Sequence, residues 1–423
     1  MKRMLSAALA LCLMLCAMGS VRAEETSLRV LDAWWAADAY REAYPDRTLE
    51  VIDPAWDEDG NSCVSELLRS GEWDAMCVET TDVTLAELDR EGLVLDLGGV
   101  PEAEKVAERL YPAIRAGVSV DGRLVALPAG YLGTRATGYR LLGTDSDGRE
   151  DAEEMKLRSQ LGFTAEDQPA TFAEVCALGL RYMALSREAR EGTIFLFSDA
   201  APQGFSLLYN LITTYQAEAT DASGALDFDT PAFRAALEDA APLLAAFAAD
   251  PKRTYAADGS LHVVLSDTVG IGTWGSFPRV TEGESVNAFM TVVIVNPNSK
   301  HLTEAVDYAL IASAQGDSTL PLLLYQDADY DALLRAGYDR DIAAQIAEGE
   351  DQSVIDELKA CQAAGDDKYF TPRAAITRYA EEIAPKLVFG RWRPISMDDA
   401  IEQYLAGKLD ADGFIAALNK EAK

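Results

Sequence analysis

Aromatic rings and small polar side chains directly follow several segments with the composition of β-strands. Trp34 and Trp35 come after the strand predicted at 28–31, and a polar run at 79–82 follows the strand predicted at 75–78. In an open parallel α/β sheet, the carboxyl ends of the strands border the ligand crevice. Aromatic faces stack on the C–H faces of sugars, and flanking polar groups bind the hydroxyls. These residues therefore predict a binding site for a small polar solute.

Further aromatic residues lie where such a site would need them. Tyr131 follows an apolar segment that ends in proline, and the stretch 272–277 combines flexible glycines with two rings. A core position is the alternative for the tandem tryptophans, and helix capping is the alternative for the polar run. For Trp56, Tyr209 and Arg373 a structural role is favoured. The predicted ligand-binding residues are Trp34, Trp35, Glu79, Thr80, Asp82, Tyr131, Trp274 and Phe277.

Catalytic motifs are missing from the sequence. It contains no G-x-S-x-G, no H-E-x-x-H and no P-loop, and its two histidines are His262 and His301. A secreted hydrolase with two well-placed carboxylates remains a less favoured alternative. Two acidic loops, at 55–66 and 143–154, share part of the EF-hand spacing but lack the acidic first ligand. We therefore expect no enzyme activity, no cofactor and no metal site, and calcium binding stays open.

The amino terminus has the pattern of a signal peptide at 1–23. A basic start is followed by an apolar run at 5–18, which is short for a membrane span of about 20 residues. Small residues precede a predicted cleavage after Ala23. Lipidation at Cys16 is an open alternative. We expect an exported protein, at the extracellular face of the cell membrane or in the periplasm.

The charge and length narrow the class of protein further. The 423 residues carry a net charge of −33, and loss of the three basic residues of 1–23 makes it −36. Such a chain repels nucleic acid and anionic membranes. The length favours two lobes, and we expect a monomer. Of the cysteines beyond 23, Cys77 and Cys176 lie in apolar runs and are predicted to be buried thiols, while a Cys63–Cys77 disulfide stays open.

The elements that would position the site alternate between strands and helices. Strands are predicted at 28–31, 49–52 and 75–78, with helices between them, which favours a parallel sheet with crossover helices. A hairpin is predicted at 120–124, with Asp-Gly at its turn. Thr171 and Glu174 form the capping box of a long helix. The chain after 300 is predicted to be mostly helical.

Six stretches resemble, in order, extracellular solute-binding proteins of ABC importers, family 1, the maltose-binding-like family. No single stretch is specific, but their common order behind a signal peptide is characteristic. Between 319 and 370 the chain is acidic and departs from the family pattern. The resembling stretches are 40–45 (YREAYP), 70–78 (SGEWDAMCV), 120–128 (VDGRLVALP), 169–174 (PATFAE), 298–300 (NSK) and 396–419.

The resemblance implies a periplasmic-binding-protein type clamp of two α/β lobes joined by hinge strands. It places lobe one at 24–128 plus 292–314 and lobe two at 129–291 plus 315–423, with chain crossings near 127–131 and 289–295. The implied function is delivery of a small solute, a sugar or oligosaccharide, to an ABC permease at the membrane. A receptor for polyamines or another solute, and a sensory or adhesive surface protein, are the alternatives. Aromatic cleft residues favour the carbohydrate.

Overall fold

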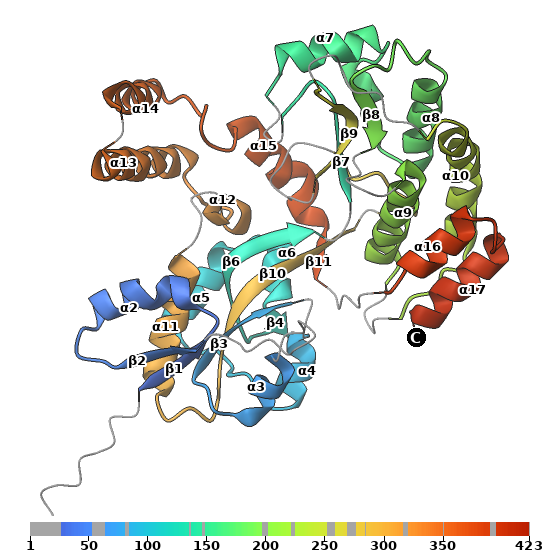
Figure 1. The fold of residues 1–423 in the computed structure, drawn as a ribbon. Coiled ribbons are helices and arrows are strands. Elements are labelled where there is room, and N and C mark those ends of the chain that lie inside the picture. Colours follow the sequence, from blue (N-terminus) through green and yellow to red (C-terminus); the bar gives the residue numbers. More distant parts are fainter. Residues whose placement is uncertain are drawn as a thin grey trace, which may run out of the picture.

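A computed structural model gives the fold, which consists of two α/β lobes with a helical hairpin beside them (Figure 1). The signal peptide expected at 1–23 and Cys16 lie outside the described residues. No helix within those residues is long and apolar enough to cross a membrane. The structure describes residues 27–52, 64–80, 84–134, 137–145, 149–196, 202–220, 225–251, 259–268, 276–283, 285–315, 320–349, 351–389 and 395–422.

The first lobe contains a six-stranded mixed sheet in the order β11-β10-β3-β1-β2, with β6 also paired to β10. β1 is parallel to β2 and β3, which confirms the predicted parallel arrangement, whereas β10 is antiparallel to β3 and β6. The predicted hairpin is confirmed as β4–β5. The strands are β1 Leu28–Leu31, β2 Leu49–Ile52, β3 Ala75–Glu79, β4 Ser119–Val120, β5 Arg123–Leu124, β6 Leu127–Thr134, β10 Val286–Val295 and β11 Leu387–Phe389.

Local sequence signals start several helices of this lobe. The side chain of Thr84 accepts a hydrogen bond from the Glu87 amide and caps α4, while α5 and α6 each begin with a proline. Proline suits the first helical turn because its missing N–H would have no partner there. The helices are η1 Trp34–Ala36, α2 Ala37–Ala43, α3 Val64–Ser70, α4 Leu85–Arg90, α5 Pro101–Arg109, α6 Pro112–Gly117, α11 Leu302–Ala314, α12 Leu320–Leu324, η3 Tyr379–Ile383 and η4 Ala384–Lys386.

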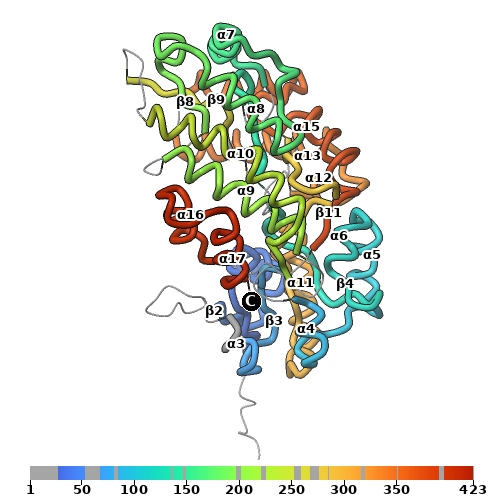
Figure 2. The backbone as a smooth tube through the Cα atoms, turned by 90° about the vertical axis from the view of Figure 1, so that its right-hand side faces the viewer, coloured from blue at the N-terminus to red at the C-terminus, as the bar shows by residue number. Residues whose placement is uncertain are grey.

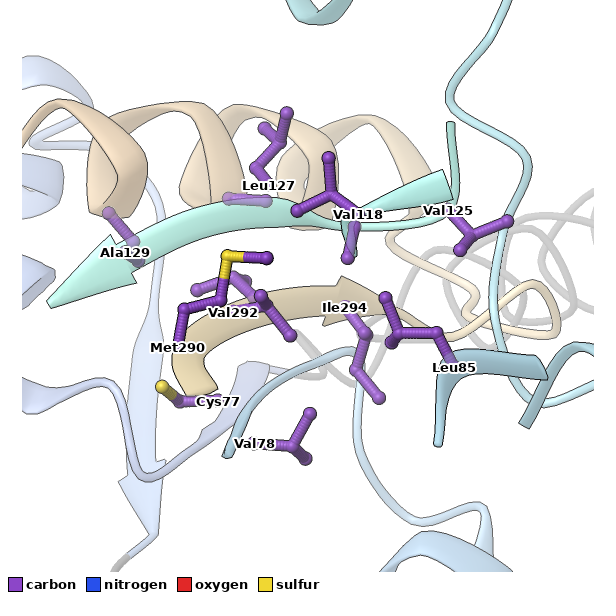
Figure 3. Close-up of a cluster of buried hydrophobic side chains, with 14 of the residues drawn as sticks. Cys77, Val78, Leu85, Val118, Val125, Leu127, Ala129, Met290, Val292 and Ile294 are labelled. Atoms are coloured by element: carbon purple, nitrogen blue, oxygen red, sulfur yellow. The ribbon is translucent and has the colours of Figure 1, made fainter. Parts of the chain in front are cut away.

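The centre of the first core lies between β3, β6 and β10. Figure 3 shows Leu127 and Ala129 on β6 close to Met290, Val292 and Ile294 on β10, with residues of β3 below them. All of these side chains are buried. Full burial of one such aliphatic side chain stabilises a fold by about 1.5–3 kcal/mol, so this seam contributes strongly to holding the lobe together.

The cysteines in the described ranges are buried free thiols. Cys77, Cys176 and Cys361 have no disulfide partner, which confirms the prediction for the first two, and Cys63 lies outside the described residues. Burial raises the pKa of Cys176 to about 12 and raises that of Cys77 well above its usual range. These thiols are therefore protonated and unreactive at neutral pH.

The second lobe contains a three-stranded sheet in the order β7-β9-β8. β9 is antiparallel to β7 and parallel to β8. The capping box of Thr171 and Glu174 at the start of α8 is confirmed. The elements are β7 Gly138–Leu141, α7 Ala152–Gln160, η2 Ala165–Asp167, α8 Phe172–Met183, β8 Thr193–Leu196, α9 Gln203–Ala219, α10 Pro231–Ala249, β9 His262–Thr268, α16 Asp398–Leu405 and α17 Ala411–Glu421.

A helical hairpin with a small core of its own follows α12. It consists of α13, Tyr330–Glu348, and α14, Gln352–Ala364, and it leads into α15, Arg373–Arg378. Both hairpin helices end at a glycine in the left-handed conformation, as helix termini often do. In Figure 1 the chain runs from α15, beside the second lobe, towards β11 of the first sheet, and in Figure 2 α15 lies at the level of the second lobe. The hairpin core is Leu334, Tyr338, Ile342, Ile355, Leu358 and Cys361.

The cores divide the chain differently from the expected boundaries. Leu132 and Val286 belong to the first core, although 129–291 was expected in the second lobe. Tyr325 and Leu387 also belong to the first core, although 315–423 was expected in the second lobe. The physical reason is strand pairing, because β6 pairs with β10 on both sides of a register shift and β11 pairs with β10.

The pH dependence of stability tests an ion pair of the second lobe. Asp250 ends α10 and pairs with Arg187 and Arg190, whose guanidinium groups lower the pKa of its carboxyl. A lowered folded pKa stabilises the protein above the unfolded value of about 3.9, and this stabilisation disappears as the pH falls through the folded pKa. We expect Asp250→Asn to lower the thermal midpoint at pH 7 and to differ less from the unaltered protein near pH 3. A midpoint difference that is equal at both pH values would contradict this.

Candidate functional site

Trp34 projects from the carboxyl end of β1. Its side chain is 64% exposed, whereas Trp35 beside it is half-buried, so the tandem pair has one outward and one inward ring. The ring centroids lie 6.3 Å apart in an edge-to-face arrangement. Asp32, between β1 and the tryptophans, has φ of 51°, a conformation that non-glycine residues adopt rarely and often near functional sites. The turn of the chain at Asp32 therefore helps to present Trp34.

Trp35 is fixed between the end of α11 and strand β6. Its Nε1 donates to the carbonyl oxygen of Ala312 at 3.5 Å, and the Tyr308 hydroxyl donates to the carbonyl of Ala33. A Cβ atom placed on Gly130 of β6 would lie 3.6 Å from the Trp35 ring and 3.6 Å from Thr291 of β10. The two long first-lobe strands therefore pass directly beside the tandem tryptophans.

The end of β3 lies in the same region. Glu79 is opposite Thr291 in the sheet register and is half-buried. The carboxylates of Glu79 and Asp32 both contribute to the raised pKa of the Cys77 thiol, which places both acids near that buried side chain. Two carboxylates therefore border the carboxyl edge of the sheet, close to the tryptophans.

Thr80 has a structural role in place of the expected ligand contact. It is only 7% exposed, its amide donates to the Met290 carbonyl at 3.0 Å, and its hydroxyl oxygen accepts from the Met290 amide at 3.1 Å. These two bonds extend the pairing of β3 with β10 beyond Glu79. Thr80 thus holds the sheet edge on which the other side chains are placed. Asp82 lies outside the described residues.

Tyr131 is the second exposed ring of the first lobe. It lies on β6 next to Gly130, is 48% exposed, and contacts Phe289 of β10 with ring centroids 5.5 Å apart. The residue before it, Gly130, lies near Trp35, because a Cβ added there would lie 3.6 Å from the Trp35 ring.

Phe277 lies at the junction of the two lobes. Its neighbour Ser276 is bonded to Tyr139 of the second lobe through both backbone groups, at 2.7 and 2.9 Å. The Phe277 ring, in contrast, packs against the first hydrophobic core. Its backbone therefore belongs to one lobe and its side chain to the other. Trp274 lies outside the described residues.

Tyr209, for which a structural role was favoured, is exposed on α9 of the second lobe. Its side chain on α9 is 42% exposed and stacks with Phe205, at 6.4 Å between ring centroids. One turn further along α9, Thr213 contacts Thr137, just beyond the end of β6, at 3.1 Å between hydroxyl oxygens. α9 thus lies beside the crossing from the first lobe. The i, i+4 spacing of 205, 209 and 213 could have revealed this face.

A structural role was also favoured for Arg373 and Trp56, of which the structure describes only Arg373. Arg373 pairs with Asp331 and lies over the ring of Tyr330 at 4.3 Å, which confirms a structural role. Trp56 lies outside the described residues. Within the described ranges no group of three or more metal-binding side chains occurs. The side chains gathered around β6 can stack on rings and form hydrogen bonds.

Replacement of Gly130 tests the left-handed backbone of β6 beside Trp35. Gly130 has φ of 80°, so alanine would be strained there although its Cβ finds space. We expect Gly130→Ala to lower the free energy of unfolding by about 1–2 kcal/mol. Chemical denaturation followed by tryptophan fluorescence measures this loss.

Gly99→Ala is the matched control in the same lobe. A Cβ there would meet no atom within 4 Å, and the backbone is outside the left-handed region. We expect a change of less than about 0.5 kcal/mol. Equal effects of the two replacements would refute a special conformation at Gly130.

Known protein structures share this fold along almost the whole chain. A sugar transporter from Rhizobium etli in an open conformation aligns with a TM-score of 0.55 and 13% identity, covering 94% of this chain and 99% of that one. The galacto-N-biose/lacto-N-biose I-binding protein of an ABC transporter from Bifidobacterium longum, in complex with lacto-N-biose, aligns with 0.53 and 14%, covering 94% of each chain. The cyclic α-maltosyl-1,6-maltose binding protein from Arthrobacter globiformis aligns with 0.51 and 15%, covering 94% and 98%.

The likeness is one of structure. No family model matches this chain, and no curated protein matches it in sequence. The similar structures are nevertheless two-lobed α/β proteins that align from end to end, so the expected fold class is confirmed. This chain has the two-lobed α/β clamp fold of the sugar-binding proteins of ABC transporters.

Proposed function

We propose that this protein is a solute-binding receptor that takes up a sugar or oligosaccharide between its lobes and delivers it to an ABC permease. The observation that carries the proposal is the exposed ring of Trp34 at the carboxyl edge of the first-lobe sheet. Trp35, Tyr131 and Glu79 lie around the same edge. A ring platform with neighbouring polar groups is suited to a sugar, whose faces are apolar and whose rim is hydroxylated.

The comparisons support this class of ligand. Of the three similar structures named above, one is a sugar transporter, one binds cyclic α-maltosyl-1,6-maltose and one binds galacto-N-biose and lacto-N-biose I. In the proposed function this chain likewise binds its solute without chemical change. Tyr209 on α9 would contact the solute from the second-lobe side, and Phe277 would contact it at the junction of the lobes.

A cationic solute such as a polyamine is the second candidate. Asp32 and Glu79 each lie near the buried Cys77 thiol, so two carboxylates occur at the ends of β1 and β3. Aromatic faces and carboxylates both attract amines. The protein would act outside the cell membrane or in the periplasm as a monomer, consistent with its sequence signals. A sensory or adhesive role would use the same clamp without the permease.

Replacement of Trp34 tests the proposed platform. The protein without residues 1–23 is screened by thermal shift against linear and cyclic oligosaccharides, spermidine and amino acids. A ligand at 100 times its Kd adds about 2.7 kcal/mol, which raises the midpoint by several degrees. For the ligand found, we expect Trp34→Ala to raise the Kd by at least about tenfold, or about 1.4 kcal/mol, because the stacking surface is lost. Isothermal calorimetry measures the Kd.

Tyr369→Ala is the control for the loss of an exposed ring. Tyr369 is 45% exposed and lies beyond α14, where its hydroxyl donates to Glu357 at 2.6 Å. We expect its removal to leave the Kd unchanged. A rise of the thermal midpoint with spermidine alone would indicate a cationic solute and not a sugar. Equal Kd values for Trp34→Ala and the unaltered protein would refute the role of Trp34 as a stacking platform.

Replacement of Tyr209 tests the contribution of the second lobe. If the solute is held between both lobes, Tyr209→Ala weakens binding by about tenfold, mainly through faster dissociation, because a contact of the closed complex is lost. Stopped-flow fluorescence measures the two rate constants. Binding kinetics identical to those of the unaltered protein would show that α9 does not contact the solute.

A further inference from the structure

The helical hairpin α13–α14 is anchored to the first lobe at its start. The side-chain amide of Gln326 donates to the carbonyl of Leu110 at 2.6 Å, and Arg109 pairs with Asp327 at 2.9 Å. Leu110 is part of the first core, so the chain entering α13 is fixed to that core. The loop before the hairpin therefore moves with the first lobe.

The chain that leaves the hairpin returns to the first lobe as well. After α15, the hydroxyl of Tyr379 donates to the carbonyl of Leu323 in α12 at 2.6 Å, and its ring contacts Tyr111 edge-to-face at 5.8 Å. Tyr379 is buried in the first core. Both ends of the segment 326–379 are thus attached to one lobe.

The connection between α14 and α15 is held rigidly on the hairpin. The Tyr330 hydroxyl hydrogen-bonds to the Asp367 carboxylate at 3.1 Å and to the Thr371 carbonyl at 2.7 Å. The ring of Phe370 packs edge-to-face on Tyr338, with 4.7 Å between centroids. Backbone carbonyls of this connection therefore have defined positions on the hairpin.

Arg149 of the second lobe donates to that connection. Its Nη2 donates to the carbonyl of Phe370 at 2.6 Å and to the carbonyl of Asp367. The arginine itself is held in its loop by Asp145, which accepts from the Arg149 amide at 2.8 Å. That loop follows Leu142, which is buried in the second core. A guanidinium can serve two carbonyls at once because it has five N–H donors in a planar fork.

We propose that Arg149 is a latch between the lobes, fastening the hairpin of the first lobe to the second lobe and limiting the hinge motion of the unliganded protein. The latch adds a contact that is separate from the covalent crossings next to β6, β10 and β11. Hinge motion of a clamp changes the distances between points far from the hinge most strongly. A bond between the hairpin and the loop at 149 must therefore stretch or break when the lobes rotate. The inference depends on the fold and not on the identity of the solute.

Single-molecule energy transfer between the lobes tests the latch without any ligand. Fluorophores are attached through unnatural amino acids at Lys105 on α5 and Glu238 on α10, which are both exposed, so the native cysteines stay untouched. We expect Arg149→Met to broaden the distance distribution and to increase amide hydrogen exchange at 366–372 by about tenfold or more, because bonds to a charged donor are lost. Arg149→Lys keeps the charge but loses the planar fork of donors. Its distance distribution and its hydrogen exchange should lie between those of Arg149→Met and those of the unaltered protein.

Arg234→Met is the matched control, because Arg234 is a similar surface arginine whose partners, Asp229 and Asp412, both belong to the second lobe. It should leave the distance distribution unchanged. An unchanged distribution in Arg149→Met would overturn the latch, and so would equal broadening in Arg234→Met. Sugar binding is measured separately, so a protein that binds no sugar can still have the latch, and the reverse also holds.

Discussion

The antiparallel pairing of β6 with β10 is the constraint on which the rest of the structure depends. The two strands are more than 150 residues apart in sequence, yet they pair at Leu127–Pro128 and again at Leu132–Thr134, on either side of a register shift, and bury the aliphatic seam of the first core. β3 and β11 pair with β10 as well, so β10 organises the first sheet. The chain continues from β6 directly into the second lobe, and β10 receives it back. The pairing therefore sets both the core of one lobe and the place where the other lobe is attached.

The candidate site is a consequence of this pairing. Gly130 gives β6 a left-handed backbone beside Trp35, and Thr80 extends β3 along β10. A residue with a side chain at position 130 would have to adopt a left-handed backbone, which costs free energy, and glycine avoids that cost. The exposed Trp34 and Tyr131 then lie beside the junction of the lobes. A solute held there would contact the part of the molecule whose geometry changes during hinge motion.

The hairpin α13–α14 lies within 319–370, the acidic stretch that departs from the family pattern, and it contacts both lobes. Its interior is small and apolar, so it does not need the lobes in order to bury its own faces. Its ends are tied to the first lobe and its return segment to Arg149 of the second. An element with contacts on both sides of a hinge can bias the equilibrium between open and closed states without touching the solute.

The sequence by itself determined the local elements. Strand and helix alternation predicted the parallel β1, β2 and β3, Asp121-Gly122 predicted the β4–β5 hairpin, and Thr171 with Glu174 predicted the start of α8. These features depend on residues close together in the chain, where side-chain period, turn geometry and capping act directly. Order of motifs along the chain also indicated the two-lobed class.

Only the tertiary structure decided which segments share a core and which side chains share a site. The assignment of 315–423 to the second lobe failed to anticipate that Leu324, Tyr379 and Leu387 pack in the first core, because pairing of β11 with β10 joins residues 100 positions apart. Thr80 was expected to bind solute, but it forms hydrogen bonds with the backbone of Met290 in β10. A structural role was favoured for Tyr209, but its side chain is exposed on α9. Long-range pairing and solvent exposure depend on the whole packed chain, and local composition does not encode them.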